Sequence, residues 1–141
     1  MKQSTIINNR KRASQLLAFD HMQYGKCRPT DIDLSMDWQG KFFTFVELKG
    51  GTAPLTIGQK IHLMGLVDAI EAGGREAIAI LAHHNTPDTD HDVHVAESIV
   101  HSVYQGGQWE KINIEIYLDT YITSLHDSYQ VSRKINKGEA A

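Results

Sequence analysis

The amino-acid sequence predicts a single α/β domain in which helices flank a mixed central sheet, and three observations lead to this fold class. Apolar residues alternate with polar ones in one stretch, fill a second stretch almost continuously, and recur at helical spacing elsewhere. Strand and helix patterns are interleaved along the chain, which is typical of a sheet with helices packed against it. No internal repeat or linker-like stretch appears, so residues 1–141 are assigned to one domain.

The first expected element is a helix over residues 6–24. Apolar side chains recur at helical spacing from Ala13 to Tyr24, and Asp20 lies on the same stripe. Pro29 ends this pattern, because the residue before a proline avoids helical geometry.

Two strands are expected next, joined as a hairpin. Strict alternation of apolar and polar residues over 31–38 predicts a strand with one buried face. After a turn at residues 39–40, residues 41–49 are apolar on both faces until Glu47, as in a central strand.

The register of this hairpin decides which side chains share a face, because a slip of one residue inverts every side chain. A three-residue loop (residues 38–40) pairs Asp37 with Lys41, and hence Asp31 with Glu47. This register gathers one set of residues on the acidic face: Asp31, Asp33, Phe45 and Glu47. The residues expected on the opposite, apolar face are Ile32, Leu34, Val46 and Leu48.

A second helix is expected after a loop at residues 50–55. Thr56 and Gln59 match a capping box, and Gly73-Gly74 ends the helix. The residues expected on its apolar side are Ile57, Ile61, Met64, Val67 and Ile70.

The remaining pattern completes the order α-β-β-α-β-β-α. The elements expected after the second helix are a strand over 76–82, an acidic, histidine-rich loop over 83–94, a strand over 95–104, a hairpin strand over 109–112, a helix over 114–127 and a flexible tail from about residue 130. This order predicts helices packed against a mixed sheet.

Composition restricts the compartment and the partners. The lone Cys27 excludes an intrachain disulfide framework and fits a reducing compartment. The apolar runs are too short to cross a bilayer, and the polar N-terminus lacks the hydrophobic region of a signal peptide. We therefore expect a cytoplasmic protein without a membrane partner.

The net charge of −3 argues at face value against a nucleic-acid partner, but it is unevenly distributed. Residues 1–75 carry a net charge of +3, and residues 76–141 carry −6. Arg10, Lys11 and Arg12 lie on the first expected helix and would contact DNA phosphates. The simpler interpretation of such a charge run is a solvated helix face.

Acidic residues lie where a core strand would be expected to stay apolar. Glu47 and Lys49 share one face of the second strand, because side chains alternate, and Asp33 comes from the first strand. Carboxylates can hold Mg²⁺, which prefers oxygen ligands, against a phosphodiester. A lysine beside them can orient water or stabilise developing charge. The simpler interpretation is a solvated strand face with an ion pair at the strand end.

The residues Thr30-Asp31-Ile32-Asp33, followed by Glu47-Leu48-Lys49, resemble the PD-(D/E)XK nuclease superfamily. Residues 29–67 are similar to small phage-type members, and the residues around both motifs are similar to archaeal Holliday junction resolvases. The resemblance covers about residues 10–85 and implies a restriction-endonuclease-like core of the αβββαβ type. It also implies the cytoplasm of a bacterial or phage-infected cell.

By this resemblance Asp33 and Glu47 are metal ligands for Mg²⁺ or Mn²⁺, and Lys49 is the catalytic lysine. Asp31 stays open as an alternative ligand, because Pro29 is displaced from the proline–aspartate pair of the family. Two residues have two open interpretations each. Gln59 is either a capping residue or a catalytic-site residue. Asp20 is either an acid at a helix end or the counterpart of a glutamate that many members carry on the first helix.

The leading hypothesis is a Mg²⁺-dependent DNA endonuclease acting on branched or junction DNA, which implies a homodimer because two strands are cut symmetrically. The alternative is a non-catalytic DNA-binding or assembly protein that retains the nuclease fold. A third hypothesis is a metal-binding protein, although the spacing matches no tight zinc pattern. Its candidate ligands are His83, His84, His91, His94, Asp88, Asp90 and Asp92.

Overall fold

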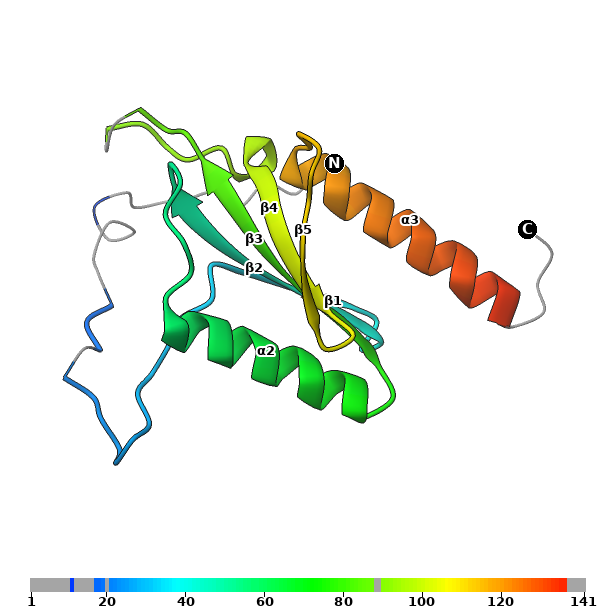
Figure 1. The fold of residues 1–141 in the computed structure, drawn as a ribbon, viewed down its shortest axis with the longest axis horizontal. Coiled ribbons are helices and arrows are strands. Elements are labelled where there is room, and N and C mark those ends of the chain that lie inside the picture. Colours follow the sequence, from blue (N-terminus) through cyan, green and yellow to red (C-terminus); the bar gives the residue numbers. More distant parts are fainter. Residues whose placement is uncertain (1–10, 12–16, 20, 88–89, 137–141) are drawn as a thin grey trace. The chain divides into compact units, whose positions relative to one another are not determined.

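The computed structural model describes residues 11, 17–19, 21–87 and 90–136. The chain divides into two units, Met1–Asp31 and Ile32–Ala141. In the second unit a five-stranded sheet lies between two helices, as Figure 1 shows. The unit is therefore of the mixed α/β class that the interleaved pattern predicts.

The strands lie side by side in sequence order. They are β1 (Leu34–Trp38), β2 (Phe42–Gly50), β3 (Glu76–His84), β4 (Ile99–Gln105) and β5 (Gln108–Lys111). Strands β2 and β3 run parallel, and the other neighbouring pairs are antiparallel. Helix α2 (Ile57–Ala72) connects β2 to β3, and helix α3 (Leu118–Asn136) follows β5. Parallel strands need such a crossover, and the helix that provides it covers one face of the sheet.

Each face of the sheet forms its own apolar core. Val46 and Ile80 are fully buried on the face that α3 covers, together with Leu118 from that helix. The other face packs Phe45 against Val67 and its neighbours on α2. Because β2 and β3 contribute to both cores, they are central strands, as the apolar run of residues 41–49 predicts.

The hairpin register differs from the predicted one by two residues. Asp37 pairs with Phe43, so the predicted pairing of Asp37 with Lys41 is wrong. The loop keeps three residues but lies one position further along the chain, at residues 39–41, and both Gln39 and Gly40 adopt a left-handed φ, of 58° and 67°. A shift of two leaves the side chains of the paired residues on their predicted faces, whereas a shift of one would invert them.

The two-residue shift changes which aspartate lies opposite Glu47. Leu34 pairs with Val46, so continuing the register by one residue places Asp33 opposite Glu47, where Asp31 was predicted. Strand β1 begins at Leu34 rather than at Asp31. Ile32 therefore lies outside the strand and packs with the core on the α2 face, not with Leu34 as predicted.

The capping box of α2 is confirmed, but the predicted buried side of the helix is partly wrong. Ile57 and Ile61 are 79% and 65% exposed, whereas Leu63 and Val67 are buried. Apolar residues occupy several sides of this helix, so helical spacing alone does not identify the buried one.

Several element boundaries differ from the prediction. Strand β3 continues through His84, and a short 3₁₀ turn (Val95–Glu97) precedes β4. Helix α3 begins at Leu118 and continues to Asn136, so the predicted tail from about residue 130 is helical as far as it is described. Strand β5 confirms the hairpin strand predicted over residues 109–112, which the summary order α-β-β-α-β-β-α did not count.

The predicted helix over residues 6–24 is wrong at its C-terminal part. Residues 17–19 and 21–24 are not helical, although Lys11 is. Tyr24 and Cys27 exchange two backbone hydrogen bonds of 2.8 and 3.0 Å around Gly25, whose φ of 64° makes a tight turn. No helix among the described residues is both long and apolar enough to span a bilayer.

Replacing Ile80 by alanine is expected to lower the free energy of unfolding by about 2–5 kcal/mol, because it leaves a cavity in a fully buried position. Ile57→Ala is the matched control and is expected to change it by less than about 0.5 kcal/mol, because Ile57 is exposed. Urea unfolding followed by circular dichroism measures both values. An equal loss in the two variants would contradict the burial of Ile80 and the exposure of Ile57.

Candidate active site

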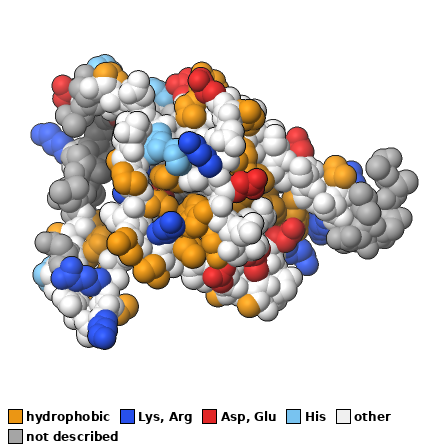
Figure 2. Space-filling view, viewed as in Figure 1, with side chains coloured by type: hydrophobic (Ala, Val, Ile, Leu, Met, Phe, Trp, Pro, Cys, Tyr) orange, Lys and Arg blue, Asp and Glu red, His pale blue; other side chains and the backbone are white. Residues whose placement is uncertain are grey.

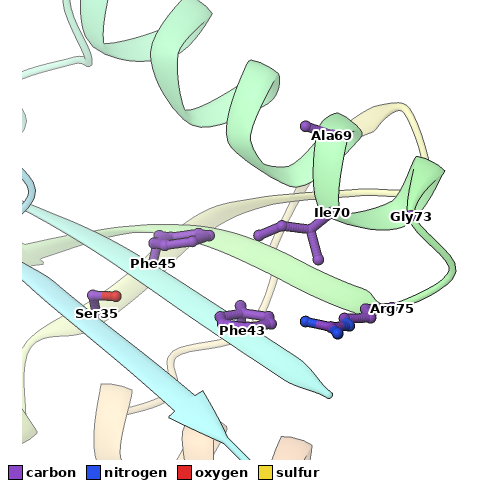
Figure 3. Close-up of a pocket in the computed structure, with 7 residues that line it drawn as sticks. All are labelled: Ser35, Phe43, Phe45, Ala69, Ile70, Gly73 and Arg75. Atoms are coloured by element: carbon purple, nitrogen blue, oxygen red, sulfur yellow. The ribbon is translucent and has the colours of Figure 1, made fainter. Parts of the chain in front are cut away.

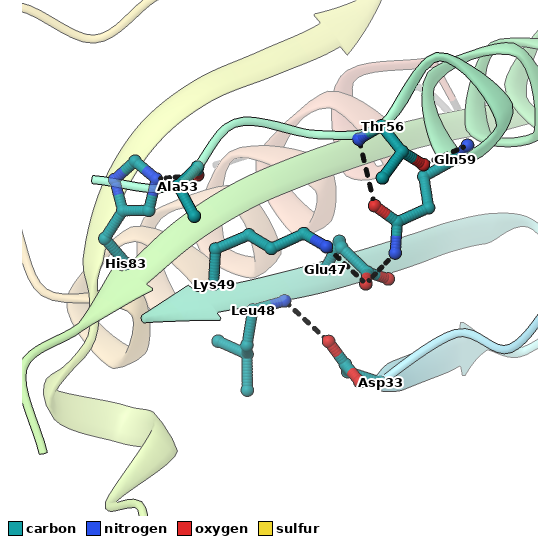
Figure 4. Close-up of polar contacts among 8 residues, drawn as sticks. All are labelled: Asp33, Glu47, Leu48, Lys49, Ala53, Thr56, Gln59 and His83. Atoms are coloured by element: carbon teal, nitrogen blue, oxygen red, sulfur yellow. Dashed lines mark hydrogen bonds and ion pairs between the residues drawn. The ribbon is translucent and has the colours of Figure 1, made fainter. Parts of the chain in front are cut away.

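Glu47 is a buried carboxylate near the C-terminal end of β2, with its side chain on the α2 face (Figure 4). Only 4% of the residue is exposed. Gln59 donates from Nε2 to Glu47 Oε1 at 2.7 Å, and Lys49 Nζ lies 3.9 Å from the same oxygen. Burying a carboxylate is costly unless it is hydrogen-bonded and paired, so Gln59 and Lys49 together stabilise Glu47 in this position.

Gln59 is oriented by the capping box at the start of α2. Its backbone N–H donates to Thr56 Oγ1, and its side-chain Oε1 accepts from the Thr56 N–H, both at 3.1 Å. The Thr56 backbone can only donate here and the carboxylate of Glu47 can only accept, so the two partners fix which end of the amide points to Glu47. The two interpretations of Gln59 are compatible: one side chain caps the helix and contacts Glu47.

Asp33 comes to the same end of the hairpin from the residue before β1. Its Oδ2 accepts from the Leu48 N–H at 2.7 Å, and in Figure 4 its carboxylate points to this amide. Residues directly opposite each other in an antiparallel pair have Cβ atoms about 4.5–5.5 Å apart. Asp33 lies one residue beyond the last ladder pair, opposite Glu47 if the register is continued, and its carboxylate is held at the backbone of the residue that follows Glu47.

The donor chemistry of Asp33 and Glu47 fits a hard cation. Proteins commonly hold Mg²⁺ through one or two carboxylates and leave its other positions to water and phosphate oxygens. No group of three or more His, Cys, Asp or Glu side chains in the described part of the chain is placed to hold a metal ion. Asp31 is exposed and belongs to the first unit, so its role as an alternative ligand stays a prediction.

The predicted DNA contacts of the first helix also stay predictions. Lys11 is exposed and belongs to the first unit. Arg10, Arg12 and Asp20 lie outside the described residues.

The predicted histidine-rich loop is partly strand. His83 and His84 are the last residues of β3, and Asp88 lies outside the described residues. His83 donates from Nε2 to the Ala53 carbonyl at 2.8 Å and so ties the strand to the loop that leads into α2. The ring of His83 lies 5.0 Å from that of His101, measured between centroids.

Sequence reasoning missed two residues near the site, His101 on β4 and Lys111 on β5. Neither belongs to a motif, and strand pairing over long sequence separations brings them to this end of the sheet. Their only signal in the sequence is a polar side chain within a strand-like pattern.

A hollow lies between the sheet and the C-terminal end of α2 (Figure 3). Phe43, Phe45 and Ile70 line it together with Arg75, and it measures ≈ 490 Å³. It contains Gly73 from the C-terminal end of α2, whereas Gln59 lies in the first turn of that helix. None of the four residues predicted to be catalytic lines this hollow. These residues are Asp33, Glu47, Lys49 and Gln59.

Comparisons of the chain with protein-family models, with curated proteins and with solved structures found no match. The fold and the site therefore define only a class: a mixed α/β protein with a buried, amide-bound carboxylate and a lysine at the end of a central strand.

Thr56→Ala is expected to lower the free energy of unfolding by about 1 kcal/mol, because the start of α2 loses its side-chain cap. Thr56→Ser retains the hydroxyl group and is expected to stay close to the wild type. Urea unfolding of the three proteins measures the difference. The capping assignment would be contradicted by serine and alanine variants of equal stability.

Proposed function

We propose that this protein is a Mg²⁺-dependent phosphodiesterase that cleaves DNA, with its active site at Asp33, Glu47 and Lys49. The observation that carries the proposal is the environment of Glu47. This residue is 4% exposed, and one of its oxygens lies 2.7 Å from the Gln59 amide and 3.9 Å from the Lys49 ammonium. Acidic side chains are rarely buried without a partner or a function, and here the partners are polar groups that can also face a phosphate.

Asp33 and Glu47 would hold the Mg²⁺, which when bound neutralises charge on the phosphate and lowers the pKa of water. Lys49 stands next to Glu47 and can donate to a phosphate oxygen or to the attacking water, so it stabilises the charge that develops in the transition state. Gln59 is a positioning residue, because it touches Glu47 and fixes the orientation of that carboxylate.

We extend the proposal to the PD-(D/E)XK superfamily and its αβββαβ core. The support is the hairpin β1–β2, the crossover helix α2 and the parallel strand β3, with Glu47 in the C-terminal half of β2 and Asp33 just before β1. One departure is that two described strands precede α2, whereas that core has three.

The proposed substrate is DNA, and the branched or junction form is the more specific expectation. Symmetric cutting of a junction needs two active sites, so this form of the proposal includes a homodimer. The non-catalytic DNA-binding alternative makes the opposite prediction for metal dependence, because its affinity would depend on Lys and Arg contacts alone.

Purified protein is expected to cleave supercoiled plasmid or a synthetic four-way junction with Mg²⁺ or Mn²⁺, and not with EDTA. Glu47→Gln and Lys49→Met are each expected to lower the cleavage rate by about 10²-fold or more, because each removes a group that contacts the metal or the phosphate. Gel electrophoresis of the products over time measures the rates.

The matched control is Glu76→Gln, which makes the same change at an exposed position at the opposite end of β3. It is expected to cleave at the wild-type rate, and circular dichroism checks the folding of every variant. DNA binding without cleavage in any divalent metal would overturn the proposal in favour of the non-catalytic alternative. Unchanged cleavage by Glu47→Gln would show that the site is elsewhere.

A further inference from the structure

A row of basic and histidine side chains crosses the sheet beside the candidate site. Lys49 on β2 pairs with His83 on β3 in the parallel register. The His83 ring contacts the His101 ring of β4 at 5.0 Å, and Lys111 of β5 pairs with the neighbouring Ser102. Four adjacent strands therefore each contribute one side chain to this row, which we call the basic row: Lys49, His83, His101 and Lys111.

A hollow of ≈ 560 Å³ lies along the basic row beyond Lys49. His83, His101 and Lys111 line it, and Thr52 and Asn113 add further hydrogen-bonding groups. None of the described residues that line it is an Asp or a Glu. Figure 2 shows histidine side chains beside a basic side chain on the visible face.

Each of the two histidines keeps one ring nitrogen, which can donate to a phosphate oxygen when the ring is protonated. The Ala53 carbonyl can only accept, so His83 carries its proton on Nε2 and keeps Nδ1 for another partner. His101 contacts Ser102 Oγ through Nδ1 at 3.1 Å, which leaves Nε2. The pKa of His101 is lowered by burial first and then by His83 and Lys111, so its charged neighbours favour an added negative charge.

We infer that His83, His101 and Lys111 form a phosphate-binding subsite that holds the DNA strand next to the phosphate at Glu47. This inference rests on the proposed function. Strands are spaced about 4.8 Å apart, so the row from β2 to β5 extends over roughly 14 Å. That length accommodates several nucleotides at about 3.4 Å of axial rise each, whereas a free phosphate would occupy only one position.

A strand of nucleic acid fits this subsite better than a transition metal does. The ammonium of Lys111 would repel a cation held by the adjacent rings. One nitrogen of each histidine is also already engaged, by Ala53 and by Ser102. An anionic backbone is favoured by the lysine and by the histidines when they are protonated.

The test is DNA binding in EDTA, where cleavage does not occur, measured by fluorescence anisotropy of a labelled oligonucleotide over a range of salt concentrations. Lys111→Gln is expected to weaken binding and to lower the slope of log affinity against log salt by about 0.7–0.9, because one phosphate contact is lost. His101→Asn is expected to weaken binding more in acidic than in neutral solution, because the lowered pKa of His101 leaves the wild-type ring uncharged until the pH falls below its ordinary range. In the cleavage assay Lys111→Gln is expected to raise KM and leave kcat unchanged.

The matched control is Lys41→Gln, which removes the same charge from the exposed hairpin at the opposite end of β2. It is expected to keep the wild-type affinity and salt slope. The inference is overturned if Lys111→Gln binds DNA like the wild type, or if the control loses as much affinity as the variant. It is also overturned if inorganic phosphate, at the concentration of the DNA phosphates, displaces the oligonucleotide, because the subsite would then bind isolated phosphate ions.

The two proposals fail in different ways. A protein that binds DNA through Lys111 but never cleaves it retains this subsite and contradicts the proposed phosphodiesterase activity. The opposite outcome is a protein that cleaves DNA through Glu47, while Lys111→Gln changes neither the KM nor the salt dependence of binding. Such a protein has the phosphodiesterase activity and lacks the subsite.

Discussion

The hydrogen bond from Gln59 to Glu47 connects the parts of the second unit that build the candidate site. Its donor belongs to the capping box of α2, and its acceptor belongs to a central strand that is buried on both faces. The same oxygen of Glu47 lies 3.9 Å from Lys49, so the lysine also depends on this contact. The start of one helix, the end of one strand and the polar groups between them are thus one structural unit.

Glu47 occupies a position where an apolar residue would continue the face of Phe43 and Phe45. Replacing a buried ionic group by a well-packed apolar one is often neutral or stabilising, so stability alone does not account for an acid here. Its solvation is replaced by Gln59 and Lys49, and Asp33 is held beside it by the Leu48 amide. This arrangement keeps the Glu47 carboxylate and the Lys49 ammonium together, with the Asp33 carboxylate at the amide of the next residue along β2.

Short-range patterns predicted the hairpin and the capping box, because alternation and capping depend on neighbouring residues. The register was wrong by two residues, since the left-handed conformation of Gln39 has no strong signal in the sequence. The buried side of α2 was wrong at Ile57, because an apolar residue near a helix start can remain exposed. His101 could not be placed beside His83 at all, since only the pairing of β3 with β4 brings them together.

The central claim is that Asp33 and Glu47 are a metal-binding pair, and diffraction from crystals soaked in Mn²⁺ tests it most directly. The account predicts an anomalous peak between these two carboxylates, within about 2.0–2.3 Å of an oxygen of each, and its loss in Glu47→Gln crystals. A peak confined to His83 and His101, or a peak at Asp33 and Glu47 that persists in Glu47→Gln, would contradict it.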